Sequence, residues 1–331
     1  MPDEEKTRII EQVTLRKLEY VRNYLASKSQ PKSGTRIEVR DRLLKLVETS
    51  DSAFNDLRGL LNELDAWGDQ RLKVAKFDLR DLKAFSTKRS VHKRIEEAGM
   101  TPLLEGEIAT EPPAALTPMV IKYVDGDTPA LQLYAAKSRI VEIPDNTIPT
   151  ITNDQYPGVI FKPYRREIQK ALDFVEINLK NGDALFSTTL LKTGASYTAE
   201  FTELFEVFEP LISLKEAATV ELYKAVKRLR NLSQQEVLIA SNDKRTSVGG
   251  RIVHRSGSTK SDLRQDKEIM SSERATRNTD SVSCNCYWAS FGNLSESVHA
   301  HIYAPEAEIS IMGQVREASV RHVLRRILEV N

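Results

Sequence analysis

Apolar residues in the first 66 positions recur at spacings of three and four, which is the period of one helix face. This pattern predicts three helices, over residues 4–29, 35–48 and 52–66. No run with strand-like alternation separates them. Residues 1–66 are therefore predicted to form a small all-helical head.

From residue 67 onward, short runs that alternate with period two dominate, and prolines and glycines interrupt them. Helical stretches fall between these runs, so residues 67–331 are predicted to form a larger domain of an α+β fold, with a mainly antiparallel sheet and flanking helices. Strands are predicted over 71–78, 103–109, 119–124, 131–136, 139–143, 174–180, 183–188, 235–240, 281–291, 294–304 and 307–312. Further helices are predicted over 79–85, 88–98, 198–209, 210–231 and 316–329.

Two features suggest finer divisions of this larger domain. A sub-boundary is expected near residue 165, where a proline-rich segment ends. The stretch 241–280 is polar and is expected to be partly a mobile loop, with a helix over Ser261–Arg274. Between the strands 174–180 and 183–188, Asn181-Gly182 is the dipeptide best suited to a two-residue type I′ turn.

The break between the first two helices has a defined chemistry. Pro31 lacks a backbone donor and biases Gln30 away from the helical region. Gly34 can adopt the left-handed conformation that a tight turn requires. Thr35 followed by Glu38 forms a capping box, which predicts where the second helix starts. Residues 15–48 thus form a helical hairpin with a basic turn.

This hairpin resembles the SAP motif, a two-helix module that binds DNA. The resemblance rests on the spacing of Leu25, Pro31, Ser33-Gly34 and Arg42-Leu43, although Ser29-Gln30 stands where the family usually has Gly-Leu. It covers about a tenth of the chain. The resemblance implies that the turn and the start of the second helix contact DNA phosphates, through Lys32, Ser33, Gly34, Thr35, Arg36 and Arg40.

The charge distribution supports a localised binding surface. The net charge is only +1, yet residues 1–48 carry about +3 and residues 222–277 about +7. Basic clusters at 86–94 and 224–230 could extend a nucleic-acid surface beyond the head. From the second cluster, Lys224, Lys227 and Arg228 are predicted to contact DNA.

The cysteines and two of the histidines suggest a metal site. A hairpin turn at Gly292-Asn293 would place Cys284 opposite His301 and Cys286 opposite His299, on one face of the sheet. Such a patch is a flat rectangle rather than a tetrahedron. The pattern therefore favours two packed, buried cysteines over a zinc site, and neither a metal nor another cofactor is expected.

The sequence favours a DNA-binding protein that is not an enzyme. It contains no glycine-rich phosphate loop, GxGxxG, HExxH or GxSxG motif. The larger domain would bind a protein partner, self-associate or extend the DNA contact. Two alternatives remain: a nuclease-like enzyme that the head targets to DNA, and a protein–protein adaptor without a DNA role. The absence of a signal sequence, of a membrane-spanning apolar run and of a disulfide framework predicts a cytoplasmic protein, or a nuclear one in a eukaryote.

Overall fold

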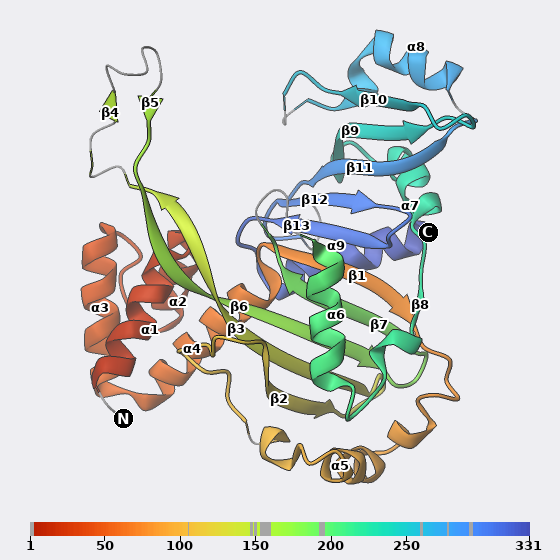
Figure 1. Ribbon diagram of the computed structural model, residues 1–331. Helices are drawn as coiled ribbons and strands as arrows, with labels where there is room; N and C mark the ends of the chain where they lie inside the picture. The colour runs from red at the N-terminus through yellow and green to blue at the C-terminus, as the bar shows by residue number, and fades with distance from the viewer. Residues whose placement is uncertain are drawn as a thin grey trace.

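The structure is a computed structural model. It describes residues 3–104, 106–145, 148, 151–152, 160–191, 196–258, 261–276, 278–290 and 294–331. These residues fold as nine α-helices and a large antiparallel sheet, which confirms the predicted α+β class (Figure 1). None of the described helices is long and apolar enough to cross a membrane.

Four helices come first, and the others are distributed along the remainder of the chain (Figure 1). The helices are α1 Asp3–Leu15, α2 Leu18–Ser27, α3 Arg36–Thr49, α4 Asp51–Trp67, α5 Lys88–Glu97, α6 Tyr197–Phe208, α7 Tyr223–Arg228, α8 Lys267–Ala275 and α9 Glu317–Val330.

The main sheet has eleven strands in the order β10-β9-β11-β12-β13-β1-β7-β6-β3-β2, with β8 paired to β1, and β4 and β5 form a separate pair. The strands are β1 Gln70–Lys76, β2 Thr117–Val124, β3 Ala130–Pro144, β4 Ile151–Thr152, β5 Ile160–Phe161, β6 Tyr164–Asn178, β7 Asp183–Thr189, β8 Ala218–Thr219, β9 Val237–Arg245, β10 Arg251–Arg255, β11 Asp280–Trp288, β12 Val298–Tyr303 and β13 Glu308–Met312.

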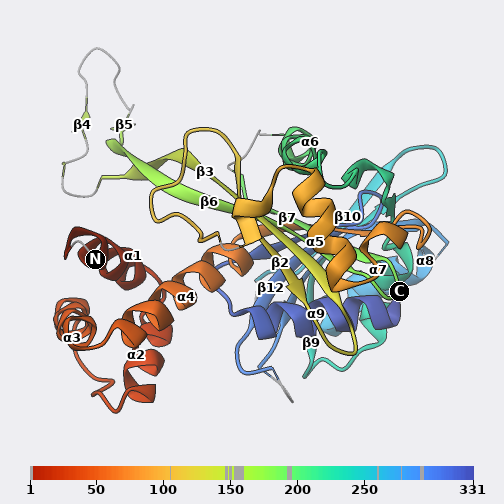
Figure 2. The same cartoon turned by 90° about the horizontal axis from the view of Figure 1, so that it is seen from below.

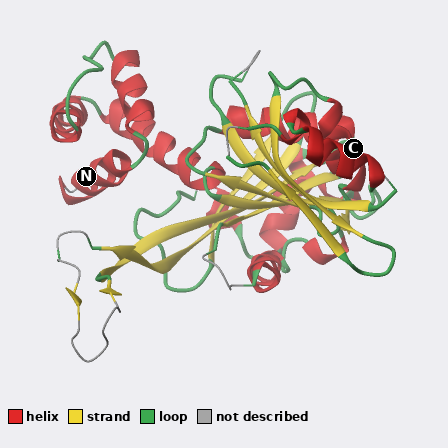
Figure 3. Cartoon of the chain, turned by 90° about the horizontal axis from the view of Figure 1, so that it is seen from above, coloured by secondary structure: helices red, strands yellow, loops and turns green. Residues whose placement is uncertain are grey.

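Strand β1 lies near the middle of the sheet, although it is the first strand of the chain. It pairs on one side with β13 and on the other with β7, both antiparallel. It therefore joins the last strands of the chain, β9 to β13, to the strands β2, β3, β6 and β7. Figure 3 shows the strands as one twisted layer with helices on both sides.

The two faces of the sheet are covered by different helices, as α6 and α9 show on opposite sides in Figure 2. Phe201 and Leu204 of α6 pack with Val91 of α5 against one face, together with Phe186 of β7. Helices α4, α7 and α9 cover the other face, where the fully buried Trp288 lies. Alternate residues of a strand point to opposite faces, so each strand contributes to both cores.

The helical head has a hydrophobic cluster of its own, built from all four helices. The expected helix 4–29 is two helices, because the chain bends at Arg16 and Lys17 between α1 and α2. The backbone N–H of Lys17 donates to the side chain of Gln314 instead of continuing the helix. Leu15, at the end of α1, is 69% exposed, and Ile37 of α3 is 64% exposed, so neither belongs to the buried face of its helix.

The last helix of the head also belongs to the large core. Trp67, at the end of α4, packs on Phe174 of β6 with ring centroids 4.7 Å apart. The division of the chain into 1–66 and 67–331 stays a prediction, as does the sub-boundary near 165. Residue 165 lies inside β6, which pairs with β3 from Tyr164 to Asn178.

The predicted helix over 210–231 is wrong. Only α7 and short 3-10 turns at Leu214–Glu216 and Leu229–Asn231 are helical there. The physical reason is that Leu211 packs in the core under α6, whereas Leu222 packs in the core on the opposite face. One straight helix cannot bury residues on both faces of the sheet. The chain instead crosses from one face to the other through β8.

Three smaller expectations also need correction. The loop between β6 and β7 has four residues, 179–182, rather than the predicted two, and Gly182 adopts φ +81°. The described part of 103–109 contains the end of a 3-10 helix and no strand. The polar stretch 241–280 contains the end of β9, all of β10 and a helix, α8, that is shorter than predicted.

Candidate functional site

The turn between α2 and α3 is tightly held by the protein's own side chains. The guanidinium group of Arg42 donates to the carbonyl oxygens of Pro31 and Ser33. Arg22 donates to the carbonyl of Gly34 over 2.7 Å. Gly34 has φ +119°, and a Cβ there would collide with the Arg42 side chain. The sequence correctly identified glycine as the residue that this turn requires.

The predicted capping box at the start of α3 is confirmed. The Thr35 hydroxyl accepts from the backbone N–H of Glu38, and the Glu38 carboxylate accepts from the N–H of Thr35 over 2.6 Å. These hydrogen bonds lower the pKa of Glu38. A carboxylate therefore already occupies this helix start, so a phosphate at the turn has to be held by side chains.

Three cationic side chains at the turn are exposed and weakly engaged. Arg40 reaches Asp41 over 3.3 Å, and its side chain is 45% exposed. Lys32 lies 3.5 Å from the amide oxygen of Asn23, and Arg36 donates to the carbonyl of Arg16 over 3.3 Å. Because these contacts are long and open to solvent, the three cations remain available to an incoming anion.

The second predicted basic cluster lines a cavity of about 420 Å³. Lys224, Lys227 and Arg228 lie three and four residues apart on α7, so they project from one face of that helix. Arg230 follows on the next turn, and Lys244 enters from β9. None of the described residues that line this cavity is acidic. We call it the cationic cavity.

The fold brings these cations together from separate elements. Helix α7 is anchored by Ala225 and Val226, which are buried against the sheet. Lys244 of β9 pairs directly with Ser281 of β11, so the two side chains share a face of the sheet and reach the cavity together. Thr279, just before β11, adds a second hydroxyl to the wall.

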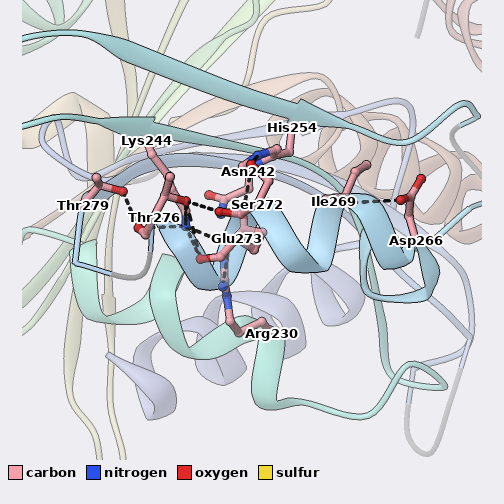
Figure 4. A network of polar contacts seen from close by, with 10 residues as sticks. All are labelled: Arg230, Asn242, Lys244, His254, Asp266, Ile269, Ser272, Glu273, Thr276 and Thr279. Carbon is pink, nitrogen blue, oxygen red and sulfur yellow. Dashed lines mark hydrogen bonds and ion pairs between the residues drawn. The ribbon is translucent and has the colours of Figure 1, made fainter.

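Beneath the cavity, Glu273 of α8 fixes two of the five cations (Figure 4). Its carboxylate lies 2.7 Å from Arg230 and 2.8 Å from Lys244, and Lys244 is 1% exposed. Burial by itself would raise the pKa of Glu273, but Lys244 and Arg230 outweigh it and lower the pKa to about 2. Glu273 is therefore an ionised, buried anchor.

The second carboxylate oxygen of Glu273 connects α8 to two strands (Figure 4). It accepts from Asn242 of β9 over 3.0 Å and lies 2.9 Å from Nδ1 of His254 in β10. The other ring nitrogen of His254 is 2.9 Å from the hydroxyl of Ser272. The network holds Lys244 and Arg230 at the cavity wall.

The head turn and the cationic cavity do not form one continuous surface. In Figures 1 and 2, α3 lies at one end of the molecule and α7 near the other, with the sheet between them. From the sequence, the basic cluster that contains Lys227 is predicted to extend the nucleic-acid surface beyond the head, where Lys32 lies. The fold places them in two separate sites, which have to be considered one at a time.

Several other charged stretches are engaged within the protein. Lys93 and Arg94 of the basic cluster 86–94 pair with Glu97 over 3.7 and 3.1 Å. Helix α6 and the residue after it carry an acidic stripe of Glu200, Glu203, Glu206 and Glu209. Glu200 lies 2.9 Å from Lys137 of β3, so the start of this stripe contacts the sheet.

The four residues of the possible zinc site lie on two faces of the sheet. The turn at Gly292-Asn293 is outside the described residues, but the strands beside it pair one residue away from the expected register. Cys284 faces Ile302 and Cys286 faces Ala300, whereas the histidines face Asn285 and Tyr287. A shift of one residue turns every side chain to the other face. Both cysteines are consequently buried in the core, and His299 and His301 lie on the opposite side.

The histidine side of the sheet carries a cluster that the sequence did not reveal. Arg71 of β1 lies 3.7 Å from the ring centroid of Tyr303 and 2.7 Å from Glu308. His301 stacks on Tyr303, and burial lowers the pKa of His301 to about 4. These residues come from strands far apart in sequence, and only knowledge of the strand order could have grouped them.

Comparison with known proteins adds no assignment: no family model matches the chain, and no curated protein is significantly similar to it.

Proposed function

We propose that the protein binds DNA through the turn of its helical head and acts without catalysing a reaction. The observation that carries the proposal is the group of three exposed cations, Lys32, Arg36 and Arg40, on a turn that Arg42 holds rigid. A rigid turn loses little conformational entropy on binding, so cations on it favour association. The resemblance of residues 15–48 to the SAP motif supports the same assignment.

The proposed contact is with phosphates rather than with base edges. Glu38 occupies the helix start beside Thr35, so the contacts come from long, mobile side chains around a carboxylate. Ser33, Gly34 and Thr35 then shape the turn, and Lys32, Arg36 and Arg40 supply the charge. Contacts of this kind position a protein on a duplex and carry little sequence preference. The larger domain remains free to bind a second partner or another copy of the chain.

The test is duplex binding across a salt series, with the intact chain and with Lys32, Arg36 and Arg40 changed together to alanine. We expect affinity to fall steeply with salt for the natural chain. The slope of log affinity against log salt should drop by up to about three in the triple variant, by roughly one for each lost phosphate contact. The matched control changes Lys162, Lys215 and Lys267, three exposed lysines elsewhere, and should keep the natural slope.

The alternatives give different results in the same assay. If the natural chain does not bind duplex even at low salt, the proposal is wrong and an adaptor role is favoured. Equal slopes for the triple variant and the control would place DNA binding elsewhere on the protein. Cleavage of the duplex after addition of magnesium would make the protein a nuclease that the head targets to DNA.

A further inference from the structure

We propose that the cationic cavity beside α7 binds a phosphate group carried by a ligand of about nucleotide size. This inference concerns a second site and does not depend on DNA binding by the head. The relevant residues are the cations of α7, the buried Lys244 and the hydroxyl group of Ser281 at the start of β11.

The positive charge of the cavity is only partly balanced. Five cationic side chains meet at the cavity, and Glu273 compensates only Arg230 and Lys244. Lys224, Lys227 and Arg228 form no ion pair with a carboxylate of the described residues, and Asp280, which lies close in sequence, is not among the residues that line the cavity. Cations that converge without a counterion repel one another, and an anion in the cavity relieves that repulsion.

The hydrogen-bonding groups of the cavity wall match a phosphate. Lysine and arginine combined with hydroxyl groups suit the oxygens of a phosphate. The Thr279 hydroxyl already donates to the carbonyl of Thr276 over 2.7 Å, so the donors for a phosphate come from the cations and from Ser281. Ser281 is only 7% exposed, and its side chain forms no hydrogen bond with the described residues. The Ser281 hydroxyl is therefore available to donate to a phosphate oxygen in the cavity.

The size of the cavity and the rigidity of its floor suit a small ligand. A cavity of about 420 Å³ lies in the range of small-molecule sites and cannot admit a DNA duplex. Its floor is held by the Glu273 network, whereas Lys224 and Lys227 at its rim are exposed. Such a site suits one phosphate or pyrophosphate group, whether on a free nucleotide or on the 5′ end of a nucleic-acid strand.

Isothermal titration calorimetry with the full chain tests the proposal. The probes are ATP, AMP, adenosine and pyrophosphate, followed by a short single strand with either a 5′ phosphate or a 5′ hydroxyl. The test variant changes Lys224 and Lys227 together to alanine. Both side chains are exposed and make no hydrogen bond or ion pair in the described structure, so the fold should be retained. The charge-matched control changes Lys162 and Lys215.

We expect pyrophosphate and ATP to bind the natural chain and the control alike, adenosine not to bind, and the test variant to bind at least about tenfold more weakly. Tighter binding of ATP than of the phosphorylated strand would identify a free nucleotide as the source, and the reverse would identify a strand end. The proposal is overturned if no phosphate probe binds at millimolar concentration, if adenosine binds as well as ATP, or if the test variant equals the control. The head variant should keep this binding, so the two proposals fail independently.

Discussion

At the scale of single residues, the side chain of Glu273 connects several elements of the fold. It is buried and joins α8 to β9, β10 and the turn that contains Arg230. Its partners lie between residues 230 and 254, and all of them except Arg230 belong to the polar stretch 241–280. The sequence could not reveal the network, because a buried ion pair leaves no periodic pattern.

Glu273→Gln should lower the stability of the protein in a pH-dependent manner. The pKa of Glu273 is about 2 in the folded protein against an ordinary 4.5, so its stabilising contribution is present above about pH 4.5 and is lost as the pH falls towards 2. Removing the charge leaves Lys244 buried without its counterion, which costs about 3 kcal/mol. Urea denaturation at pH 7 and pH 3 should show a deficit that at pH 3 is about half of its value at pH 7.

The control for this experiment is Glu268→Gln on the exposed part of the same helix, which should change the free energy of unfolding by less than about 0.5 kcal/mol. A deficit that is equal at both pH values would show that Glu273 acts through packing rather than through its charge.

At the scale of elements, the sequence was most informative where local chemistry alone determines the structure. The start of α3 was predicted from Thr35 and Glu38, and α6 and α9 from their apolar faces. The sequence did not predict features that depend on contacts between residues far apart in the chain. The register of β11 and β12 depends on the geometry of their turn, and a one-residue difference separated the cysteines from the histidines.

The extent of β9 was missed for a similar reason. Its second half, from Ser241 to Arg245, is polar, and Asn242 and Lys244 are buried only because α8 supplies partners for them. A strand that buries polar side chains has the composition of a loop. The residues of the cationic cavity could be identified as basic from the sequence, but their convergence depends on the second half of β9, which the sequence did not predict.

Thr35→Ala should destabilise the protein by about 1 kcal/mol, because the start of α3 loses a side-chain acceptor for its backbone N–H group. Thr87→Ala removes the corresponding cap of α5 and is the matched comparison. Chemical denaturation of both variants measures the effect. If Thr35 only caps the helix, the affinity for DNA at a fixed salt concentration should not change. A loss of affinity with an unchanged salt slope would mean that its hydroxyl also contacts a phosphate, because a neutral group releases no counterion.

At the scale of the whole molecule, β1 makes the sheet a single unit, because it pairs with β13 on one side and β7 on the other. The two tryptophans report on separate parts of this sheet. Trp67 lies against β6, and Trp288 lies at the end of β11. If β1 couples the strands on its two sides, both parts should unfold together.

Leu72→Ala in β1 should lower the free energy of unfolding by about 2–5 kcal/mol, because Leu72 is completely buried. Single-tryptophan variants made with Trp67→Phe or Trp288→Phe should report the same denaturation midpoint, and Leu72→Ala should shift both midpoints equally. Two distinct midpoints would show that the parts on either side of β1 unfold separately.

The central position of β1 also has a consequence for synthesis on the ribosome. Lys76 ends β1 early in the chain, whereas its neighbour β13 begins only at Glu308. A nascent chain therefore presents one side of β1 without its partner until nearly all the other strands have been translated. Unpaired strand edges recruit other strands, so molecules interrupted before Glu308 are the ones most prone to aggregate and most in need of a chaperone.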